Sequence, residues 1–281
     1  MQITRHSSAV GAEVGNVDLR NLDNDQFAEL RAAFQQHGAL FFRDQRLTPE
    51  QHIAFAERWG VININRFFQA VDGYPQIAQV LKEPDQTLNI GGAWHTDHSY
   101  DQEPAMSSIL YALEVPPHGG DTLFAGMAAA YDALSDTYKA LLAPLSAVHS
   151  SRHVFGKQAA HQRAMEDRFE NPELATQDSV HPLVIQHPET GQSLLYVNPA
   201  FTVRIEGLAE EESNMLLQFL YQHAMNPEFH TRFHWEKGSL AMWDNRATWH
   251  YALNDYQGQR RHLHRITIAG SKLRAAKPPV S

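Results

Sequence analysis

The feature that most constrains the fold is a series of short, β-like segments that fills the chain from Ile77 onward. Each segment is rich in β-branched and aromatic residues and ends at a cluster of proline, glycine or aspartate, as strands joined by turns do. The segments span residues 77–81, 105–115, 122–125, 147–151, 183–186, 193–197, 229–235, 240–243 and 261–269. Strands of this number and length favour a β-sandwich or a jelly roll. The chain is therefore predicted to be mainly β.

Three helices are predicted to flank these strands. The first is capped by Asn24 and ends at Gly38, before a buried strand at 39–42, and the second runs from Thr48 to Gly60. The third covers residues 210–223, and its apolar face is predicted to contain Met215, Leu216, Phe219 and Leu220.

The chain is predicted to form a single domain over residues 1–281, because no internal repeat or Ser/Gly linker interrupts it. Residues 272–281 are expected to be a flexible tail. Residues 150–179 are rich in His, Arg and Glu and lack periodicity. We expect this segment to be a mobile lid over a functional site.

Composition excludes several classes of partner and site. The formal net charge of -9 disfavours nucleic acid. Cysteine is absent, so a metal must be bound by His, Asp or Glu, and the chain offers 17 histidines. The amino terminus does not resemble a signal peptide and no stretch is long enough to span a membrane, so a cytoplasmic protein with no membrane partner is expected.

The first candidate for chemistry is the pair His95 and Asp97. Residues two apart on an extended segment point to the same side and can chelate one ion. Short pairs of this kind also arise by chance, and His187/Glu189 and His234/Glu236 have the same spacing. The commoner explanation of any one pair is a polar strand surface.

A distant segment strengthens the first pair, because His250 is followed by two arginines on one predicted strand. Strand alternation places Arg261 and Arg265 on the same face, about 13 Å apart. If that face is buried, each arginine needs an anionic partner; otherwise it is an exposed basic face. Two histidines and one carboxylate leave coordination positions free, which suits Fe(II) and O2 chemistry.

These residues and the strings around them carry a family resemblance. The strings WHTD, GGDTLF, WDNRATWHYA and QRRHLHRITIAG, with their spacing, resemble the Fe(II)/2-oxoglutarate-dependent dioxygenases of the taurine dioxygenase and 2,4-dichlorophenoxyacetate (aryloxyalkanoate) dioxygenase family. The resemblance implies a mainly β fold with flanking helices, a double-stranded β-helix of the jelly-roll, cupin-like type.

The resemblance also implies roles for single residues. The ligands of Fe(II), which also binds O2, would be His95, Asp97 and His250. The far carboxylate of 2-oxoglutarate would be held by Thr122 and Arg261. A small anionic organic substrate would contact Arg265, Phe201, Asn63 and Asn89.

Two departures from the taurine dioxygenase pattern bear on the substrate. Gly91 stands where those enzymes have asparagine, and the loop at 61–68 carries Ile62, Ile64, Phe67 and Phe68 in place of amine-binding polar residues. A larger or less polar tail than that of taurine is therefore expected. The implied substrate is an alkylsulfonate, alkyl sulfate or aryloxyalkanoate, hydroxylated with formation of succinate and CO2. Collapse of the product would release sulfite, sulfate or a phenol.

Three alternatives remain open from the sequence. The chain could be a taurine dioxygenase proper, a His/Asp metal-dependent hydrolase that uses Zn(II), or an anion-binding jelly roll. The hydrolase leaves Arg261 and Thr122 unexplained, and a binding module has no use for an open metal site. A homodimer or homotetramer is expected because closed symmetric oligomers are common.

Overall fold

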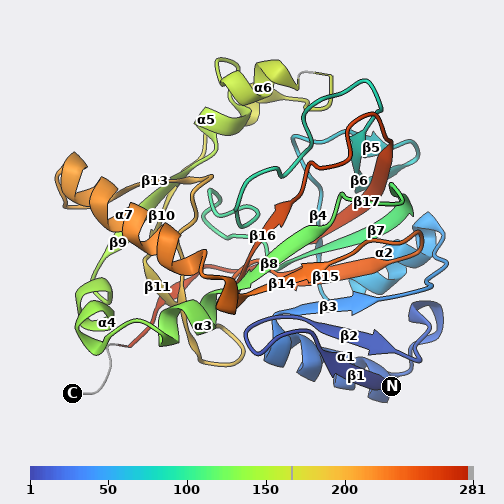
Figure 1. Cartoon of the computed structure of the whole chain (residues 1–281), viewed down its shortest axis with the longest axis horizontal. Coiled ribbons are helices and arrows are strands. Elements are labelled where there is room, and N and C mark those ends of the chain that lie inside the picture. The colour runs from blue at the N-terminus through green and yellow to red at the C-terminus, as the bar shows by residue number, and fades with distance from the viewer. Residues whose placement is uncertain (166, 278–281) are drawn as a thin grey trace.

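The computed structural model describes residues 1–165 and 167–277, and half of its strands belong to one large sheet (Figure 1). The strand order is β1-β2-β3-β15-β7-β17-β6-β5, with β4 also paired to β17. Every ladder is antiparallel except that between β2 and β3. The strands are β1 (Gln2–Arg5), β2 (Ala12–Gly15), β3 (Ala39–Phe42), β4 (Ile62–Asn63), β5 (Ala70–Val71), β6 (Tyr74–Lys82), β7 (Ser107–Glu114), β15 (Leu240–Asp244) and β17 (Arg261–Ile268).

Three smaller sheets have the orders β14-β8-β16, β10-β9-β13 and β12-β11-β18. Their strands are β8 (Thr122–Gly126), β9 (Ser146–Ser150), β10 (Asp178–Pro182), β11 (Val184–Gln186), β12 (Ser193–Leu195), β13 (Thr202–Ile205), β14 (His230–Phe233), β16 (Thr248–Ala252) and β18 (Arg274–Ala275). The first of these sheets faces the large sheet, and the rings of Phe41 and Phe233 stack across the interior with centroids 4.4 Å apart. Two facing sheets with this antiparallel order form the expected jelly roll.

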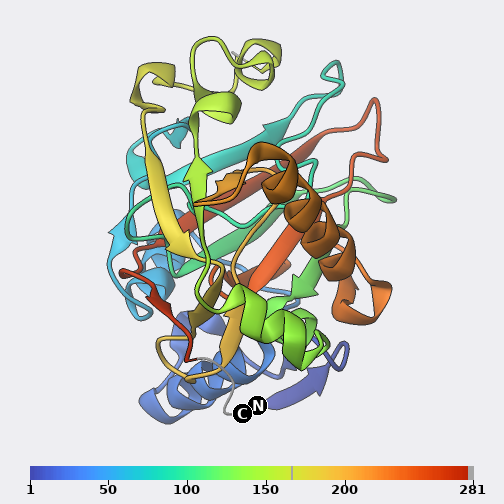
Figure 2. The ribbon, with the colours of Figure 1, turned by 90° about the vertical axis from the view of Figure 1, so that its left-hand side faces the viewer.

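Helices cover both outer faces of this pair of sheets (Figures 1 and 2). The α-helices are α1 (Asn24–His37), α2 (Pro49–Glu57), α3 (Met127–Asp132), α4 (Asp136–Leu142), α5 (Arg152–Phe155), α6 (Ala160–Ala164) and α7 (Glu210–Ala224). Of these, α5 and α6 cover neither outer face and lie apart at the top of Figure 1. Leu30 of α1 and Phe55 of α2 pack against the large sheet, whereas Leu220 of α7 packs beyond the small one with Trp249. In the part of the chain that the structure describes, no helix has the length and apolarity needed to cross a bilayer.

The first two helices confirm the prediction and show how the sequence sets their ends. The cap of α1 is Asp23 rather than Asn24, because the Asp23 side chain accepts a hydrogen bond from the Gln26 backbone. Gly38 ends the helix with a left-handed φ of 68°, a conformation that glycine adopts without strain. Thr48 and Gln51 form a capping box at the start of α2.

Two predictions outside the strands need correction. In α7 the predicted apolar face is wrong for Met215 and Phe219, which are 72% and 38% exposed, and right for Leu220, which is buried. The helix packs on its neighbours through an adjacent stripe, which consists of Ser213, Leu217, Leu220, Tyr221 and Ala224. The predicted flexible tail is anchored in part, because Arg274–Ala275 form β18 and pair with β11. Residues 278–281 lie outside the described residues.

Candidate active site

Three potential metal ligands converge inside the jelly roll. The ligand atoms of His95, Asp97 and His250 all lie within 4.8 Å of one another. His95 Nε2 is 3.7 Å from Asp97 Oδ1, and His250 Nε2 is 3.8 Å from Asp97 Oδ2. The two other pairs with the His-x-Asp/Glu spacing, His187/Glu189 and His234/Glu236, do not join this cluster. His187 donates to Asp244, and His234 pairs with Asp121.

A short backbone bridge holds the two histidines together. The N–H of His95 donates to the carbonyl of His250 at 3.1 Å, and the N–H of His250 donates back at 2.8 Å. Asp97 lies in the turn that follows, next to His98 with a φ of 60°. The predicted extended segment is therefore short, since His95 forms an isolated bridge and a turn begins at Asp97. The side chains of His95 and Asp97 meet on one side of the chain, as predicted.

The protonation states of the three side chains suit a divalent metal. His95 Nδ1 donates to the Ala93 carbonyl at 2.7 Å, which leaves the lone pair of Nε2 facing Asp97. Burial lowers the pKa of His95 and that of His250, so both rings are neutral. Burial alone would raise the pKa of Asp97, but Arg265 and the histidines lower it below its ordinary value. Two neutral imidazoles and one carboxylate match the ligand set of non-haem Fe(II) sites.

A narrow cavity of about 40 Å³ on one side of the ligands contains Arg261 and Thr122. Arg261 is only 4% exposed, and its Nε donates to the Gly120 carbonyl at 3.1 Å. Its Nη2 is buried with no hydrogen-bond partner among the described residues, and burial lowers the pKa of the guanidinium. Thr122 Oγ1 accepts from Trp235 Nε1 at 2.9 Å, so its hydroxyl proton remains free to donate. A buried cation without a counter-ion marks this cavity as a site for an anion.

A larger cavity of about 530 Å³ lies on the other side of the ligands and is mostly apolar. Arg265 lines both cavities, with Nη1 3.3 Å from Asp97 Oδ1 and Nη2 donating to His98 Nε2 at 3.3 Å. The predicted residue Phe201 is in this wall, with its ring edge-on to His95 at 6.3 Å. The aromatic residues of the lining are Phe68, Tyr100, Phe155, Phe169, Phe201 and Tyr251.

The two asparagines expected at the substrate have different positions. Asn89 lines the larger cavity, but its Nδ2 donates to the carbonyls of Ala252 and Leu253 at 2.8 and 3.2 Å. Its amide nitrogen therefore ties the loop before the ligands to the end of β16. Asn63 lies in β4 opposite Thr267 and lines neither cavity, so it is not placed to contact a substrate bound there.

The apolar loop at 61–68 contributes less to the cavity than predicted. Phe68 lines it, and Phe67 is buried and stacks on Phe155 at 4.5 Å. Ile62 instead packs against the outer core beneath α1 and α2, and Ile64 is 57% exposed. The prediction is wrong for these two isoleucines because the short β4 strand directs the loop along the outside of β17.

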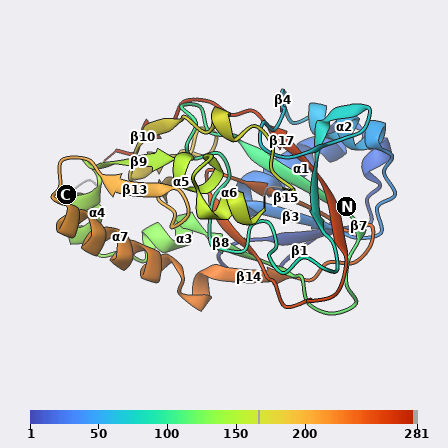
Figure 3. The ribbon, with the colours of Figure 1, turned by 90° about the horizontal axis from the view of Figure 1, so that it is seen from above.

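Other residues at the site were not found from the sequence. His98 contacts Arg265, and Ser108 of β7 donates to Asp97 at 2.7 Å. Phe155 and Phe169 reach the larger cavity from the segment that carries α5 and α6, which lies at the top of Figure 1 and faces the viewer in Figure 3. The one sequence feature that could have pointed to His98 is its position directly after the WHTD string. The two phenylalanines lie in a segment without periodicity, which offers no such signal.

Comparison with known proteins gives consistent matches along the chain. The model of the family described as "Taurine catabolism dioxygenase TauD, TfdA family" matches residues 2–267. An alkylsulfatase from Acinetobacter baylyi is 34% identical over 96% of this chain and 85% of its own length. An (S)-phenoxypropionate/alpha-ketoglutarate-dioxygenase from Sphingobium herbicidovorans is 34% identical over 92% of both chains. The crystal structure of a taurine dioxygenase from Burkholderia xenovorans has a TM-score of 0.84 and 37% identity, and the match covers 99% of this chain and 93% of that one.

Proposed function

The chain belongs to the taurine catabolism dioxygenase TauD, TfdA family, and from this premise we propose that it is an Fe(II)- and 2-oxoglutarate-dependent dioxygenase that hydroxylates a small anionic substrate. One observation carries the proposal. A buried arginine, with one guanidinium nitrogen that has no partner among the described residues, faces a cavity that adjoins three converging candidate metal ligands. A hydrolase that uses the same ligands has no role for this arginine, and an anion-binding protein has none for the ligands.

The proposed metal ligands are His95, Asp97 and His250, whose two nitrogens and one carboxylate fit Fe(II). When bound, the metal supplies the redox chemistry in which one oxygen atom of O2 enters succinate as CO2 leaves 2-oxoglutarate, and the other enters a substrate C–H bond as a hydroxyl group. The protein contributes neutral imidazoles, an ionised carboxylate and a mostly apolar cavity beside them.

Arg261 and Thr122 are the proposed partners of the far carboxylate of 2-oxoglutarate. The free Nη2 of Arg261 and the hydroxyl of Thr122 both belong to the narrow cavity, and both have a proton to donate. A carboxylate there would supply the charge that the buried guanidinium lacks. The same cavity includes His95 and His250, so a molecule held at Arg261 extends toward the metal ligands.

Arg265 is the proposed partner of the anionic group of the substrate, and the aromatic wall of the larger cavity would contact its tail. Asp97 is the single acidic side chain in the described lining of this cavity, and it is engaged with the metal and Arg265. The ammonium group of taurine would therefore find no free carboxylate there. An alkylsulfonate, alkyl sulfate or aryloxyalkanoate with an apolar or aromatic tail fits better.

Hydroxylation of such a substrate would lead to cleavage. A carbon that carries both a new hydroxyl and a sulfonate, sulfate ester or aryl ether oxygen collapses to a carbonyl. The group lost is sulfite, sulfate or a phenol, respectively. Its release can be measured independently of succinate.

The experiment that tests this proposal is a coupled screen of the purified protein. We expect anaerobic Fe(II) and 2-oxoglutarate to give a visible charge-transfer band. O2 uptake should then couple to succinate with alkyl sulfates or aryloxyalkanoates far better than with taurine. Bound Fe(II) without a band or succinate would contradict the dioxygenase, and efficient coupling to taurine would contradict the proposed tail.

Four further parts of the proposal await their own tests. We propose that the whole chain is one catalytic domain, which the family match over residues 2–267 supports. A homodimer or homotetramer is proposed on the general frequency of such oligomers, and light scattering would test it. A cytoplasmic location is proposed because 2-oxoglutarate and reduced iron are available there.

The proposed lid at 150–179 is supported by Phe155 and Phe169, which this segment places in the wall of the larger cavity. Unchanged protease sensitivity on adding co-substrate and substrate would contradict the lid.

A further inference from the structure

The metal-ligand candidate Asp97 has a second partner deeper in the fold. Ser108 of β7 is fully buried, and its Oγ donates to Asp97 Oδ2 at 2.7 Å. The same Oγ accepts from Asn245 Nδ2 at 3.2 Å. An amide nitrogen only donates and an ionised carboxylate only accepts. The hydrogen bonds therefore run in one direction, from Asn245 through Ser108 to Asp97.

Asn245 occupies the turn between β15 and β16, and this turn contacts both segments that carry the ligands. Its backbone N–H donates to the Met106 carbonyl at 2.9 Å. Its carbonyl accepts from Thr96 Oγ1 at 2.5 Å, and Thr96 lies between His95 and Asp97 in the sequence. The strand that leaves the turn, β16, carries His250. The position of this turn thus sets the position of all three ligands.

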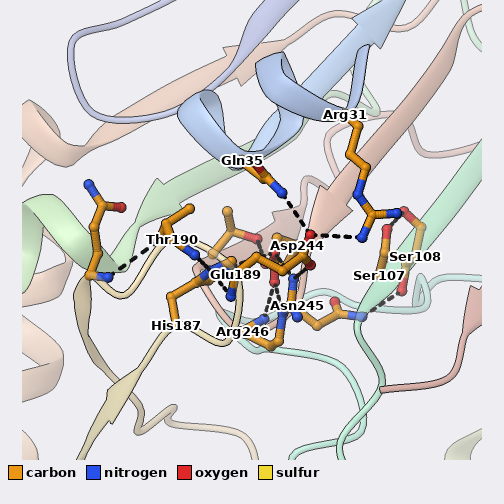
Figure 4. Close-up of polar contacts among 12 residues, drawn as sticks. Arg31, Gln35, Ser107, Ser108, His187, Glu189, Thr190, Asp244, Asn245 and Arg246 are labelled. Carbon is orange, nitrogen blue, oxygen red and sulfur yellow. Dashed lines mark hydrogen bonds and ion pairs between the residues drawn. The ribbon is translucent and has the colours of Figure 1, made fainter. Parts of the chain in front are cut away.

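A network of polar and charged groups fixes the turn from the outside (Figure 4), and it runs from buried residues beside the turn to exposed residues at the surface. Asp244 accepts from Arg246 Nη2 at 2.6 Å and from His187 Nε2 at 3.0 Å. Arg246 Nη2 also donates to Glu189, which in turn pairs with Arg31 and Gln35 of α1, as the dashed lines show. Each charge in this network has an opposite partner, as its buried charges require. The network therefore anchors Asn245 and, through it, Ser108.

On the premise of the proposed function, we infer that Ser108 is a positioning residue for the metal site. It holds Asp97 by Oδ2, which also lies 3.8 Å from His250 Nε2, and so fixes the carboxylate with Oδ1 toward His95 and Arg265. A carboxylate without this partner can rotate and bind a metal through either or both oxygens. Partners of this kind around metal ligands are commonly worth roughly 10- to 100-fold in metal affinity.

The neighbouring residue Ser107 provides a matched control for Ser108. Both serines are on β7 and fully buried, and both are drawn in Figure 4. Among the described residues, the Ser107 hydroxyl has one hydrogen-bond partner, the Ser108 carbonyl at 3.5 Å, and none of the candidate ligand side chains. Ser107→Ala and Ser108→Ala thus remove the same atom from the same strand, and only the second removes a partner of Asp97.

The test is titration of the full-length, metal-free protein with Co(II), with the visible spectrum as readout and no turnover involved. Ser108→Ala should raise the Kd for Co(II) at least tenfold and alter the d–d bands, as the coordination of Asp97 changes. Ser107→Ala should stay within threefold of the wild type. Asn245→Ala keeps the Ser108 hydroxyl but removes its donor, and it should raise the Kd about threefold.

Each outcome of this titration decides one question. Equal Kd values for Ser108→Ala and Ser107→Ala would overturn the inference. If thermal melting shows that Ser108→Ala does not fold, Asn245→Ala provides the test instead. A Kd for Co(II) in Asn245→Ala equal to that of the wild type would overturn the role of the chain of hydrogen bonds. Absence of Co(II) binding by the wild type would instead contradict the metal site on which the proposed function rests.

Discussion

The two cavities beside the metal ligands share a wall but differ in how that wall is built. Ile90, Gly91, His95 and Arg265 line both. The rest of the narrow cavity comes almost entirely from strands and includes Thr122 of β8, Trp243 of β15 and Arg261 of β17. The rest of the larger cavity comes mainly from loops around residues 88–93 and 200–201 and from the segment at 150–179.

This difference separates the chemistry of the site from its selectivity. Strand residues are fixed by ladders on both sides, so the cavity beside Arg261 admits little variation in shape. Loop residues are free of such ladders and can change without disturbing the sheets. We infer that the narrow cavity determines which co-substrate is used, and the larger cavity determines which substrate is hydroxylated.

The largest effect is expected where both cavities meet. His95→Ala removes a ligand that lines both of them, so it should abolish Fe(II)-dependent O2 uptake and bring Co(II) binding below detection. His234→Ala is the control, because this histidine is exposed and belongs to a His-x-Glu pair outside the metal cluster. Succinate formation by His95→Ala at the wild-type rate would remove it from the ligand set.

Arg261→Met tests the narrow cavity alone. Loss of a charge-assisted hydrogen bond costs about 1.5–3 kcal/mol, so the Kd for 2-oxoglutarate should rise roughly 10- to 100-fold. The ligand-free protein should be nearly as stable as the wild type, because loss of the Nε hydrogen bond to the Gly120 carbonyl is offset by removal of a buried charge that has no ion-pair partner among the described residues. Calorimetric titration and thermal melting measure the two effects.

The matched control for this substitution is Arg260→Met. Arg260 is the preceding residue, but it pairs with Glu83 and Glu114 near the surface. Arg260→Met should leave the affinity for 2-oxoglutarate unchanged. Equal effects of the two substitutions would mean that the arginines act through the general charge of the protein.

Arg265→Met tests the larger cavity. We expect the KM of the anionic substrate to rise about tenfold or more, on the scale of one lost charge-assisted contact. Slow 2-oxoglutarate decay without substrate should persist. Because Arg265 also contacts Asp97, the Co(II) Kd must be measured in the same variant, and the assignment stands only if this Kd changes less than KM. An unchanged KM would exclude Arg265 as the substrate anchor.

The sequence predicted the strand-built half of the site better than the loop-built half, and the reason is physical. Strand alternation placed Arg261 and Arg265 on one face, and the structure brings both to the narrow cavity. Family resemblance added Thr122, whose position on β8 follows from the ladder with β16. Local periodicity is enough for such residues, because the backbone direction sets the side-chain direction.

The loop-built half depends on long-range packing that no local pattern records. Ile62 and Ile64 are as apolar in the sequence as Phe67 and Phe68, yet of these four residues only Phe68 lines the larger cavity. Asn63 was misplaced for the same reason, since its strand pairs with the outer end of β17. Phe155 and Phe169 come from a segment more than 80 residues beyond that loop, so the contact between them and Phe68 becomes visible only in the fold.

His98 gives the smallest and most discriminating test, because it contacts Arg265, the proposed substrate anchor, but does not line the larger cavity. Its Nε2 accepts from Arg265 and its Nδ1 donates to Asp101, so the ring links the anchor to a second carboxylate. The φ of 60° at this position suits asparagine as well as histidine. His98→Asn should therefore keep the backbone while losing a side chain long enough to reach both partners. We expect a rise of about threefold in substrate KM, because the variant loses a long hydrogen bond from Arg265, 3.3 Å, while Arg265 keeps its contact with Asp97. The Kd for 2-oxoglutarate should not change. Equal changes in both constants would mean that the turn after Asp97 has moved, and the two cavities could no longer be regarded as independent.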